Sequence, residues 1–417
     1  QYNLAFFFTI PSVKSIFINN KIMNVWNKKI EAESNSYNWL DKPKIISSLK
    51  KEKNDFIHID LFSGCGGFSE GFHQAGFKTE VAIDIHPPSM ETLLNNHKST
   101  NGILGDIKKV KENTINDLIS NKKSIKVLTA GVPCQGFSLS NRKRHSEDKR
   151  NYLFKEFIRI AKFINPDAVI LENVSGLAST KDGFFKKNIS KAISDLGFDV
   201  SFSLINSADY GLPQTRRRVF FIGVRKGLKW LFPKKTHGMN LKPYVTVKDA
   251  ILGDLPKLKN KEEKKIYISK PTSDYQKYLR RENEVLTNHV SPNHPESTIK
   301  KILNTKPGSP MYPKFKQRIR LDANSLSPTQ VCGGIRPQFQ FGHPNQPRGL
   351  TIRERARIQG FPDSYFFSGG MVQGRVQTGN AVPVLVAKQL AKQLLDLING
   401  KKIIGIPEKK MQLDLFK

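Results

Sequence analysis

Short apolar segments rich in β-branched and aromatic residues alternate with amphipathic segments of helical length from Asp55 onward. The apolar segments predict buried strands at residues 56–62, 80–85, 125–130, 168–171 and 219–224. Amphipathic segments at residues 152–163 and 184–196 predict helices between strands. This order is typical of βαβ units, so we expect an α/β fold with a mostly parallel sheet flanked by helices.

The alternation stops after Arg225. Residues 234–348 are rich in Lys, Pro, Asn and Ser and carry the charged run 257–265, which predicts a separate, irregular and basic module. Periodic segments at 351–360 and 382–397 then predict helices that return the chain to the first unit.

We therefore expect a first domain at residues 54–233, a second at 234–347 and a returning segment at 348–417. Residues 1–53 would form an extension, partly non-native or flexible. The chain starts with Gln1, and we expect Met23 to be the natural start, a mitochondrial-type leader being the alternative.

The charge balance favours a polyanionic partner. Lysine and arginine number 68 against 36 acidic residues, a formal net charge of +32. Nucleic acid would neutralise such an excess. A coding bias toward lysine that leaves a solvated surface would produce the same count.

Cysteine usage and hydropathy exclude several classes of protein. The three cysteines, Cys65, Cys134 and Cys332, are far apart and lack Cys-x-x-Cys spacing, so they predict neither a disulfide framework nor a metal site and fit a reducing cytoplasm. No apolar run approaches the roughly 20 residues that span a bilayer. We expect no membrane association.

Several predicted strands run directly into small or reactive residues. The turn at 63–67 follows the first strand, Asp84 ends the second, Cys134 follows the third and Glu172 follows the fourth. Ligands of open α/β sheets bind beyond the carboxyl ends of the strands. We expect these four pieces to meet in one cleft.

The glycine-rich turn predicts a site for a nucleotide-like ligand. Its glycines let the backbone approach such a ligand closely, and Asp84 could accept hydrogen bonds from a ribose diol. The Gly-x-Gly-x-x-Gly spacing of dinucleotide sites is absent, which favours adenosine without a pyrophosphate. A turn that only allows close helix packing is the alternative.

Cys134 is a candidate nucleophile and Glu172 a candidate acid. Cys134 lies in a loop beside Gly131 and Gly136 with basic residues 142–144 close behind, which favours a reactive thiolate. Glu172 follows an apolar strand, so burial could help it retain a proton for donation to a ring nitrogen. A buried, inert cysteine and a carboxylate that caps a turn are the alternatives.

The basic segment 214–218 precedes the last predicted strand. Strand alternation places Gln214, Arg216 and Arg218 on one face and Arg217 on the other. An arginine on the cleft side could orient Glu172 or hold a pyrimidine carbonyl and a phosphate. A solvated basic edge is the alternative.

Taken in order, these motifs resemble the DNA (cytosine-5) methyltransferase family, in particular the methylases of bacterial restriction–modification systems. The resemblance covers residues 60–224 and 342–385. It rests on Asp-Leu-Phe-Ser-Gly-Cys-Gly-Gly-Phe at 60–68, Gly-Val-Pro-Cys-Gln-Gly-Phe-Ser at 131–138, Glu-Asn-Val at 172–174, Gln-Thr-Arg-Arg-Arg at 214–218, Arg-Gly-Leu-Thr-Ile-Arg-Glu at 348–354 and Gln-Thr-Gly-Asn-Ala-Val-Pro at 377–383.

The resemblance implies a Rossmann-like S-adenosylmethionine-dependent fold and a known chemistry. The target cytosine is flipped into the pocket, Cys134 adds to carbon 6, and Glu172 bonds ring nitrogen 3 and the exocyclic amine. Carbon 5 then accepts the methyl group. Arg218 resembles the arginine that contacts the flipped base, with Arg216 as its partner.

The resemblance also assigns the cofactor, S-adenosylmethionine, which leaves as S-adenosylhomocysteine, and no metal. The positions that match cofactor contacts are Phe62, Cys65, Gly66, Gly67, Asp84, Ile85, Asp106, Ile107, Gly131, Leu153, Asn380 and Val382. Asp84 departs from the family's usual glutamate, and Pro87-Pro88 departs from its usual helical start.

The implied partner is double-stranded DNA, read by the basic insert at 234–347 as a target recognition domain. Candidate DNA contacts are Gln135, Ser138, Arg318, Arg320 and Arg336. We expect a monomeric cytoplasmic enzyme, associated with the nucleoid, that protects the site of a restriction endonuclease to which it does not bind.

Three alternatives remain at this point. A tRNA cytosine-5 methyltransferase shares the chemistry, although it has less need for a groove-reading insert. A catalytically dead DNA-binding methylase would not need Cys134, Glu172 and Arg218. A nicotinamide-dependent oxidoreductase is the generic interpretation of a glycine-rich α/β chain.

Overall fold

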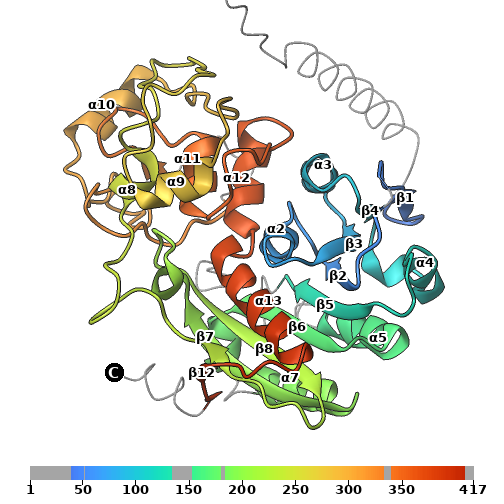
Figure 1. Cartoon of the computed structure of the whole chain (residues 1–417). Helices are drawn as coiled ribbons and strands as arrows, with labels where there is room; N and C mark the ends of the chain where they lie inside the picture. Colours follow the sequence, from blue (N-terminus) through green and yellow to red (C-terminus); the bar gives the residue numbers. More distant parts are fainter. Residues whose placement is uncertain (1–38, 51, 134–152, 180–183, 333–339, 409–417) are drawn as a thin grey trace, which may run out of the picture.

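An eight-stranded sheet forms the centre of the protein in the order β1-β4-β3-β2-β5-β6-β8-β7 (Figure 1). The computed structural model describes residues 39–50, 52–133, 153–179, 184–332 and 340–408. The strands are β1 Lys44–Ile46, β2 Phe56–Leu61, β3 Lys78–Asp84, β4 Asn101–Leu104, β5 Ile125–Gly131, β6 Ala168–Val174, β7 Phe198–Asn206 and β8 Arg217–Arg225. Pairing is parallel from β4 to β6, whereas β1 and β8 run antiparallel to their neighbours.

The five predicted strands and the mostly parallel sheet are confirmed. Their apolar runs are buried on both faces, as parallel strands covered by helices require. The sequence did not predict β1, β4 or β7. Strand β7 has the sequence FDVSFSLIN, and its polar, partly exposed positions hide an edge strand from a search for apolar runs.

Helices cover both faces of the sheet, giving three layers. On one face, α4 (Glu112–Asp117), α5 (Phe154–Ile164) and α7 (Phe184–Ser194) bury residues such as Phe157 and Ile189 against the strands. On the other, α2 (Gly67–His73) packs beside α13 (Val384–Ile398) (Figure 1). Both helices predicted between strands are confirmed as α5 and α7. Helix α3 (Pro87–Asn96) covers β3 and β4, and α6 spans Gly176–Ser179.

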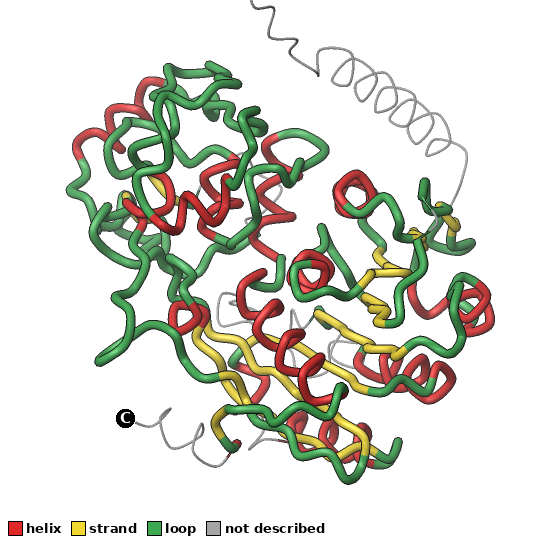
Figure 2. The backbone as a smooth tube through the Cα atoms, viewed as in Figure 1, coloured by secondary structure: helices red, strands yellow, loops and turns green. Residues whose placement is uncertain are grey.

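The segment after β8 builds a second lobe made largely of loops (Figure 2). Its elements are α8 Val247–Ile251, α9 Asp274–Arg280, α10 Glu296–Asn304, β10 Ile319–Arg320, β11 Phe341–Gly342, α11 Ile352–Ile358 and α12 Met371–Asn380. They enclose a small apolar core of their own that includes Val247, Leu279 and Ile358. The irregular character predicted for this segment is confirmed.

Helix α11 is buried in the second lobe and holds its segments together. Thr351 and Glu354 form a capping box at its start. Near its end, the Arg357 guanidinium binds the carboxylates of Asp254 and Asp363, at 2.7 and 2.6 Å, with all three side chains fully buried. The predicted helices at 351–360 and 382–397 are confirmed as α11 and α13. The predicted return to the first unit from residue 348 is wrong for α11, which packs in the core of the second lobe, whereas α13 brings the chain back onto the sheet.

Two short features complete the described chain. Strand β9 (Phe232–Pro233) pairs with β12 (Gly405–Ile406), and single 3₁₀ turns occupy Ile107–Lys109 and Ser207–Tyr210. Every helix in the described ranges is too short or too polar to cross a membrane.

Candidate active site

A cleft of about 820 Å³ lies at the carboxyl ends of β2, β3, β5 and β6, where the sequence placed it. Its size falls within the range of small-molecule sites. The cofactor positions predicted from the sequence that line it are Phe62, Cys65, Asp84, Ile85, Asp106, Ile107, Gly131, Leu153, Asn380 and Val382. Glu172, Arg216 and Arg218 line the same cleft, so the predicted catalytic residues and the predicted cofactor positions share one cavity.

Asp84 holds the glycine-rich turn through its carboxylate. Its two oxygens accept the backbone N–H groups of Gly64 at 2.7 Å and His86 at 2.8 Å. Burial raises the pKa of Asp84, and these two bonds oppose that effect. The Asp84 side chain, shorter than the family's usual glutamate, therefore bonds the backbone of both Gly64 and His86 while it lines the cleft.

Gly66 and Gly67 are not among the residues that line the cleft, so their predicted contact with a cofactor stays a prediction. Gly66 has φ 90°, and a Cβ there would stand 2.6 Å from the Tyr365 hydroxyl. A Cβ on Gly67 would stand 2.4 Å from the carbonyl oxygen of Val382. Both glycines let α2 approach the returning chain, as the close-packing alternative for this turn requires.

Asp60 fixes the turn from beneath the cleft. Its carboxylate accepts hydrogen bonds from Ser69 Oγ at 2.7 Å and Thr129 Oγ1 at 2.9 Å, which joins β2 to α2 and β5. Burial raises the pKa of Asp60 to about 7. Asp60, the first residue of the motif, therefore has a structural role and does not line the cleft.

Glu172 and Arg218 form a buried ion pair on adjacent strands. In the antiparallel register, Val174 of β6 lies opposite Arg218 of β8, which brings Arg218 Nε to 3.1 Å from Glu172 Oε1. Burial raises the pKa of Glu172, opposed by the nearby charges of Arg218 and then Arg216. The raised pKa favours the neutral acid that the sequence predicted.

Arg216 is buried at 1% exposure and holds backbone instead of a carboxylate. Its guanidinium donates to the carbonyls of Gln330 at 2.8 Å, Gly379 at 3.0 Å and Ala381 at 3.1 Å. Burial lowers the pKa of Arg216. Its hydrogen bonds fix two walls of the cleft, whereas the sequence assigned it to catalysis beside Arg218, a role that stays a prediction.

The predicted alternation at 214–218 is confirmed. Gln214 and Arg216 are buried, Arg217 is exposed, and Arg218 faces Glu172. Gln214 bonds Gln359 Oε1 at 2.8 Å and the amide of Gln330 at 2.8 Å. This segment therefore ties the sheet to the second lobe.

Cys134, Gln135, Ser138 and Arg336 lie outside the described residues, so their predicted roles stay predictions. The chain just before Cys134 is described, and both Val132 and Pro133 line the cleft. The candidate nucleophile is therefore one residue beyond a residue of the cleft wall.

The two remaining candidate DNA readers differ. Arg320 donates to the carbonyls of Ile302, Leu303, Thr305 and Pro344, at 2.8 to 3.2 Å. These bonds make it a loop anchor, which disagrees with the predicted base contact. Arg318 stacks on Phe315, 4.6 Å from the ring centre, beside Tyr312. Its role in DNA contact stays a prediction.

Sequence reasoning missed part of the lining. These residues are Ser63, Gly64, Phe68, Ile83, His86, Ser89, Gly105, Val132, Pro133, Val174, Gln330, Val331, Cys332, Val376, Gln377, Gly379 and Ala381. Many neighbour a predicted position along the chain. Gln330–Cys332 comes from the second lobe, and no local pattern links it to the sheet.

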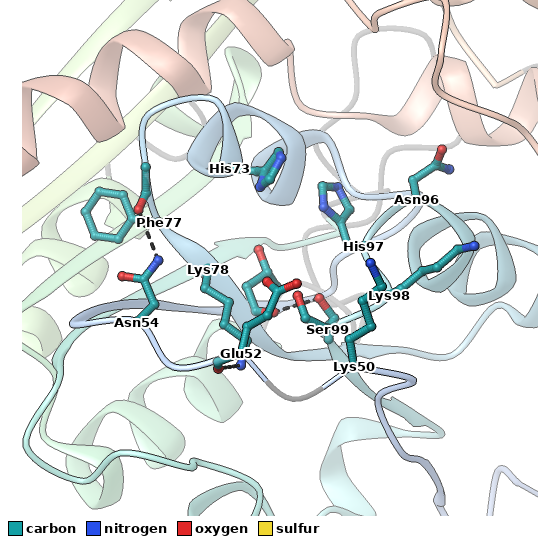
Figure 3. Close-up of a pocket in the computed structure, with 13 residues that line it drawn as sticks. Lys50, Glu52, Asn54, His73, Phe77, Lys78, Asn96, His97, Lys98 and Ser99 are labelled. Carbon is teal, nitrogen blue, oxygen red and sulfur yellow. Dashed lines mark hydrogen bonds between the residues drawn. The ribbon is translucent and has the colours of Figure 1, made fainter. Parts of the chain in front are cut away.

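Another cavity, of about 440 Å³, lies at the opposite, amino-terminal ends of β2 and β3 (Figure 3). Lys50, Lys78, His73 and His97 are among the side chains that surround it. None of the predicted site residues lines it, so it is separate from the candidate active site. Within the described ranges, no group of His, Cys, Asp and Glu side chains could hold a metal ion.

The fold is α/β, and one cleft brings most of the predicted cofactor positions together with the Glu172–Arg218 pair. The family model for C-5 cytosine-specific DNA methylase matches residues 56–396. The chain belongs to this family of DNA cytosine-5 methyltransferases, which confirms the resemblance.

Individual similar proteins support the same assignment. The chain is 33% identical over 352 residues to Type II methyltransferase M1.HphI of Haemophilus parahaemolyticus, covering 82% of this chain and 87% of that protein. It is 34% identical over 383 residues to Type II methyltransferase M.DdeI of Desulfomicrobium norvegicum, covering 83% and 91%. A prophage-encoded E. coli structure described as a DNA modification methyltransferase superposes with a TM-score of 0.70 at 27% identity, covering 82% and 99%.

Proposed function

We propose that the cleft binds S-adenosylmethionine and a flipped cytosine side by side, and that Cys134, Glu172 and Arg218 carry out the transfer. The observation that supports this most is the convergence of Glu172 and Arg218 with ten of the twelve predicted cofactor positions on one cavity. Methyl transfer needs both substrates within one water-poor space.

The residues present fit the cofactor. Asp84 presents a carboxylate with lone pairs beyond its two backbone bonds, which suits a ribose diol. Ile85 exposes about half of its side chain (49%) at the cleft, where an adenine ring would cover it. Bound S-adenosylmethionine supplies the electrophilic methyl group.

The side chains prepare the cytosine for attack. The Cys134 thiolate adds to carbon 6, while neutral Glu172 donates its proton to ring nitrogen 3 so that the electron pair reaches carbon 5. Arg218, held by Glu172, faces the same space and donates to the pyrimidine carbonyl. After carbon 5 is methylated, a base takes its proton, the electrons of that C–H bond restore the C5–C6 double bond, and the C6–S bond breaks to release the Cys134 thiolate. Ring nitrogen 3 returns its proton to Glu172.

Residues 234–347, the part of the second lobe that precedes α11, serve as the target recognition domain. Duplex DNA lies against it, Arg318 is one contact, and Gln135, Ser138 and Arg336 are others. The enzyme acts as a monomer in the bacterial cytoplasm, at the nucleoid. It protects the recognition site of a restriction endonuclease that works separately.

Bisulfite sequencing of plasmid from cells that express the chain tests this function. We expect one short sequence to be protected at a single cytosine and unprotected in cells that express Cys134→Ser. Unmethylated plasmid together with methylated cellular tRNA would overturn the DNA assignment.

A further inference from the structure

The nucleophile loop leaves the sheet at the place where one ladder of hydrogen bonds ends. Strands β5 and β6 pair up to Gly131 and Glu172. Beyond that point β6 continues only with β8, where Asn173 lies opposite Val219. The carbonyl of Val132 is therefore the first beyond the β5–β6 ladder, and the residue is buried.

Asn173 supplies the bond that the ladder no longer provides. Its side chain is 2% exposed, and Nδ2 donates to the Val132 carbonyl at 3.2 Å. Its Oδ1 accepts the N–H of Val174 at 2.8 Å. Because the oxygen is held by a donor, the nitrogen must face the carbonyl, which fixes the orientation of the amide.

Asn173 does not share the cleft with its neighbours. Consecutive strand residues point to opposite faces, and accordingly Glu172 and Val174 line the cleft whereas Asn173 does not. The Asn173 side-chain amide bonds the backbone of Val132, just before Pro133, from the face of the strand that points away from the cleft. Within the part of the chain that the structure describes, it therefore reaches the reaction through the Val132 backbone that it holds.

We propose that Asn173 is a positioning residue that sets the direction in which the chain leaves β5, and so the placement of Cys134 against the base. The inference rests on the proposed role of Cys134 as nucleophile. One strand thus provides the acid through Glu172 and orients the nucleophile through Asn173.

Asn173→Asp tests the idea with almost no change in volume. It replaces the N–H donor with an oxygen, so that the Val132 carbonyl faces a repelling partner. We expect kcat and the rate of covalent adduct formation on 5-fluorocytosine duplex to fall about 10²-fold, because a displacement of about 1 Å costs that much. The KM for DNA and the Kd for S-adenosylmethionine should stay at the wild-type values.

Asn101→Asp is the matched control. Asn101 Nδ2 also bonds backbone carbonyls, those of Glu80 and Leu118, but at the start of β4 and away from the cleft. Its adduct rate should equal that of wild type. Asn173→Ala, which removes the donor without adding charge, provides the same comparison if the aspartate variant does not fold.

The outcomes separate the inference from the proposed function. A wild-type adduct rate in folded Asn173→Asp or Asn173→Ala would overturn the positioning role and leave Cys134 untouched. A parallel loss of cofactor affinity would also overturn it, since general damage to the sheet would then explain the slow rate. Failure of the wild-type enzyme itself to form an adduct would overturn the proposed function.

Discussion

Replacing Arg216 with lysine distinguishes a wall-holding arginine from one that touches the base. The guanidinium reaches carbonyls of Gln330, Gly379 and Ala381, which belong to two separate parts of the chain. A single ammonium keeps the charge but has one compact head in place of a planar fork. We expect Arg216→Lys to retain one of the three bonds.

The magnitude follows from the one or two carbonyls left without a donor, because the Ala381 carbonyl also accepts a hydrogen bond from Gln359 Nε2 at 2.7 Å. Each buried, unsatisfied carbonyl costs about 1–3 kcal/mol. Relief from burying the large guanidinium offsets part of this, so the free energy of unfolding should fall by about 2–4 kcal/mol. If about 1.4 kcal/mol of that appears at the cleft wall beside Asn380, the Kd for S-adenosylmethionine rises about tenfold.

Urea denaturation and calorimetric titration with S-adenosylmethionine measure both effects. Arg217→Lys is the control, because its exposed neighbouring side chain should change neither quantity. A variant Arg216→Lys that keeps wild-type stability and cofactor affinity but loses methylation would refute this reasoning. Arg216 would then act on the base, as the sequence suggested.

Three further outcomes follow from the structure. Burial raises the pKa of Glu172, so adduct formation should fall as pH rises through that pKa, while protonation of the attacking thiol limits the rate at low pH. In stopped-flow assays, Glu172→Gln should be slower by about 10²-fold or more and should lose the fall at high pH while it keeps the limit at low pH. Arg357→Met removes the arginine from two buried aspartates, leaving Asp363 with Arg353 at 3.7 Å and Asp254 without an ion-pair partner in the described part of the chain, and should lower the free energy of unfolding in urea by about 3–5 kcal/mol. Gly67→Ala forces a Cβ against backbone and should cost about 1–3 kcal/mol in the same assay, whereas Gly370→Ala, with open space around it, should not.

The sequence predicted the parallel core because buried strands and amphipathic helices have local periods. It placed Glu172 and Asp84 at one cleft because parallel strands end at one edge of a sheet. Alternation alone put Arg216 and Arg218 on one face, and the structure confirms it.

The parts of the site that the sequence did not predict depend on contacts between segments far apart in the chain. Whether Gly67 approaches a cofactor or Val382 cannot be decided from a glycine turn, since both need the missing side chain. Arg320 was chosen as a DNA reader from composition, but it bonds carbonyls at the end of α10 and the carbonyl of Pro344. Gln330 enters the cleft from the second lobe, and only the fold brings it there.

Covalent trapping on duplex DNA that contains 5-fluorocytosine at the methylated position tests the central claim most directly. Fluorine cannot leave carbon 5 as a cation, so an enzyme that attacks carbon 6 through Cys134 should remain bonded to the DNA after methyl transfer. We expect a denaturation-resistant complex with wild type and S-adenosylmethionine, and none with Cys134→Ser. Equal trapping by Cys134→Ser, or methylation by that variant at the wild-type rate, would contradict the account.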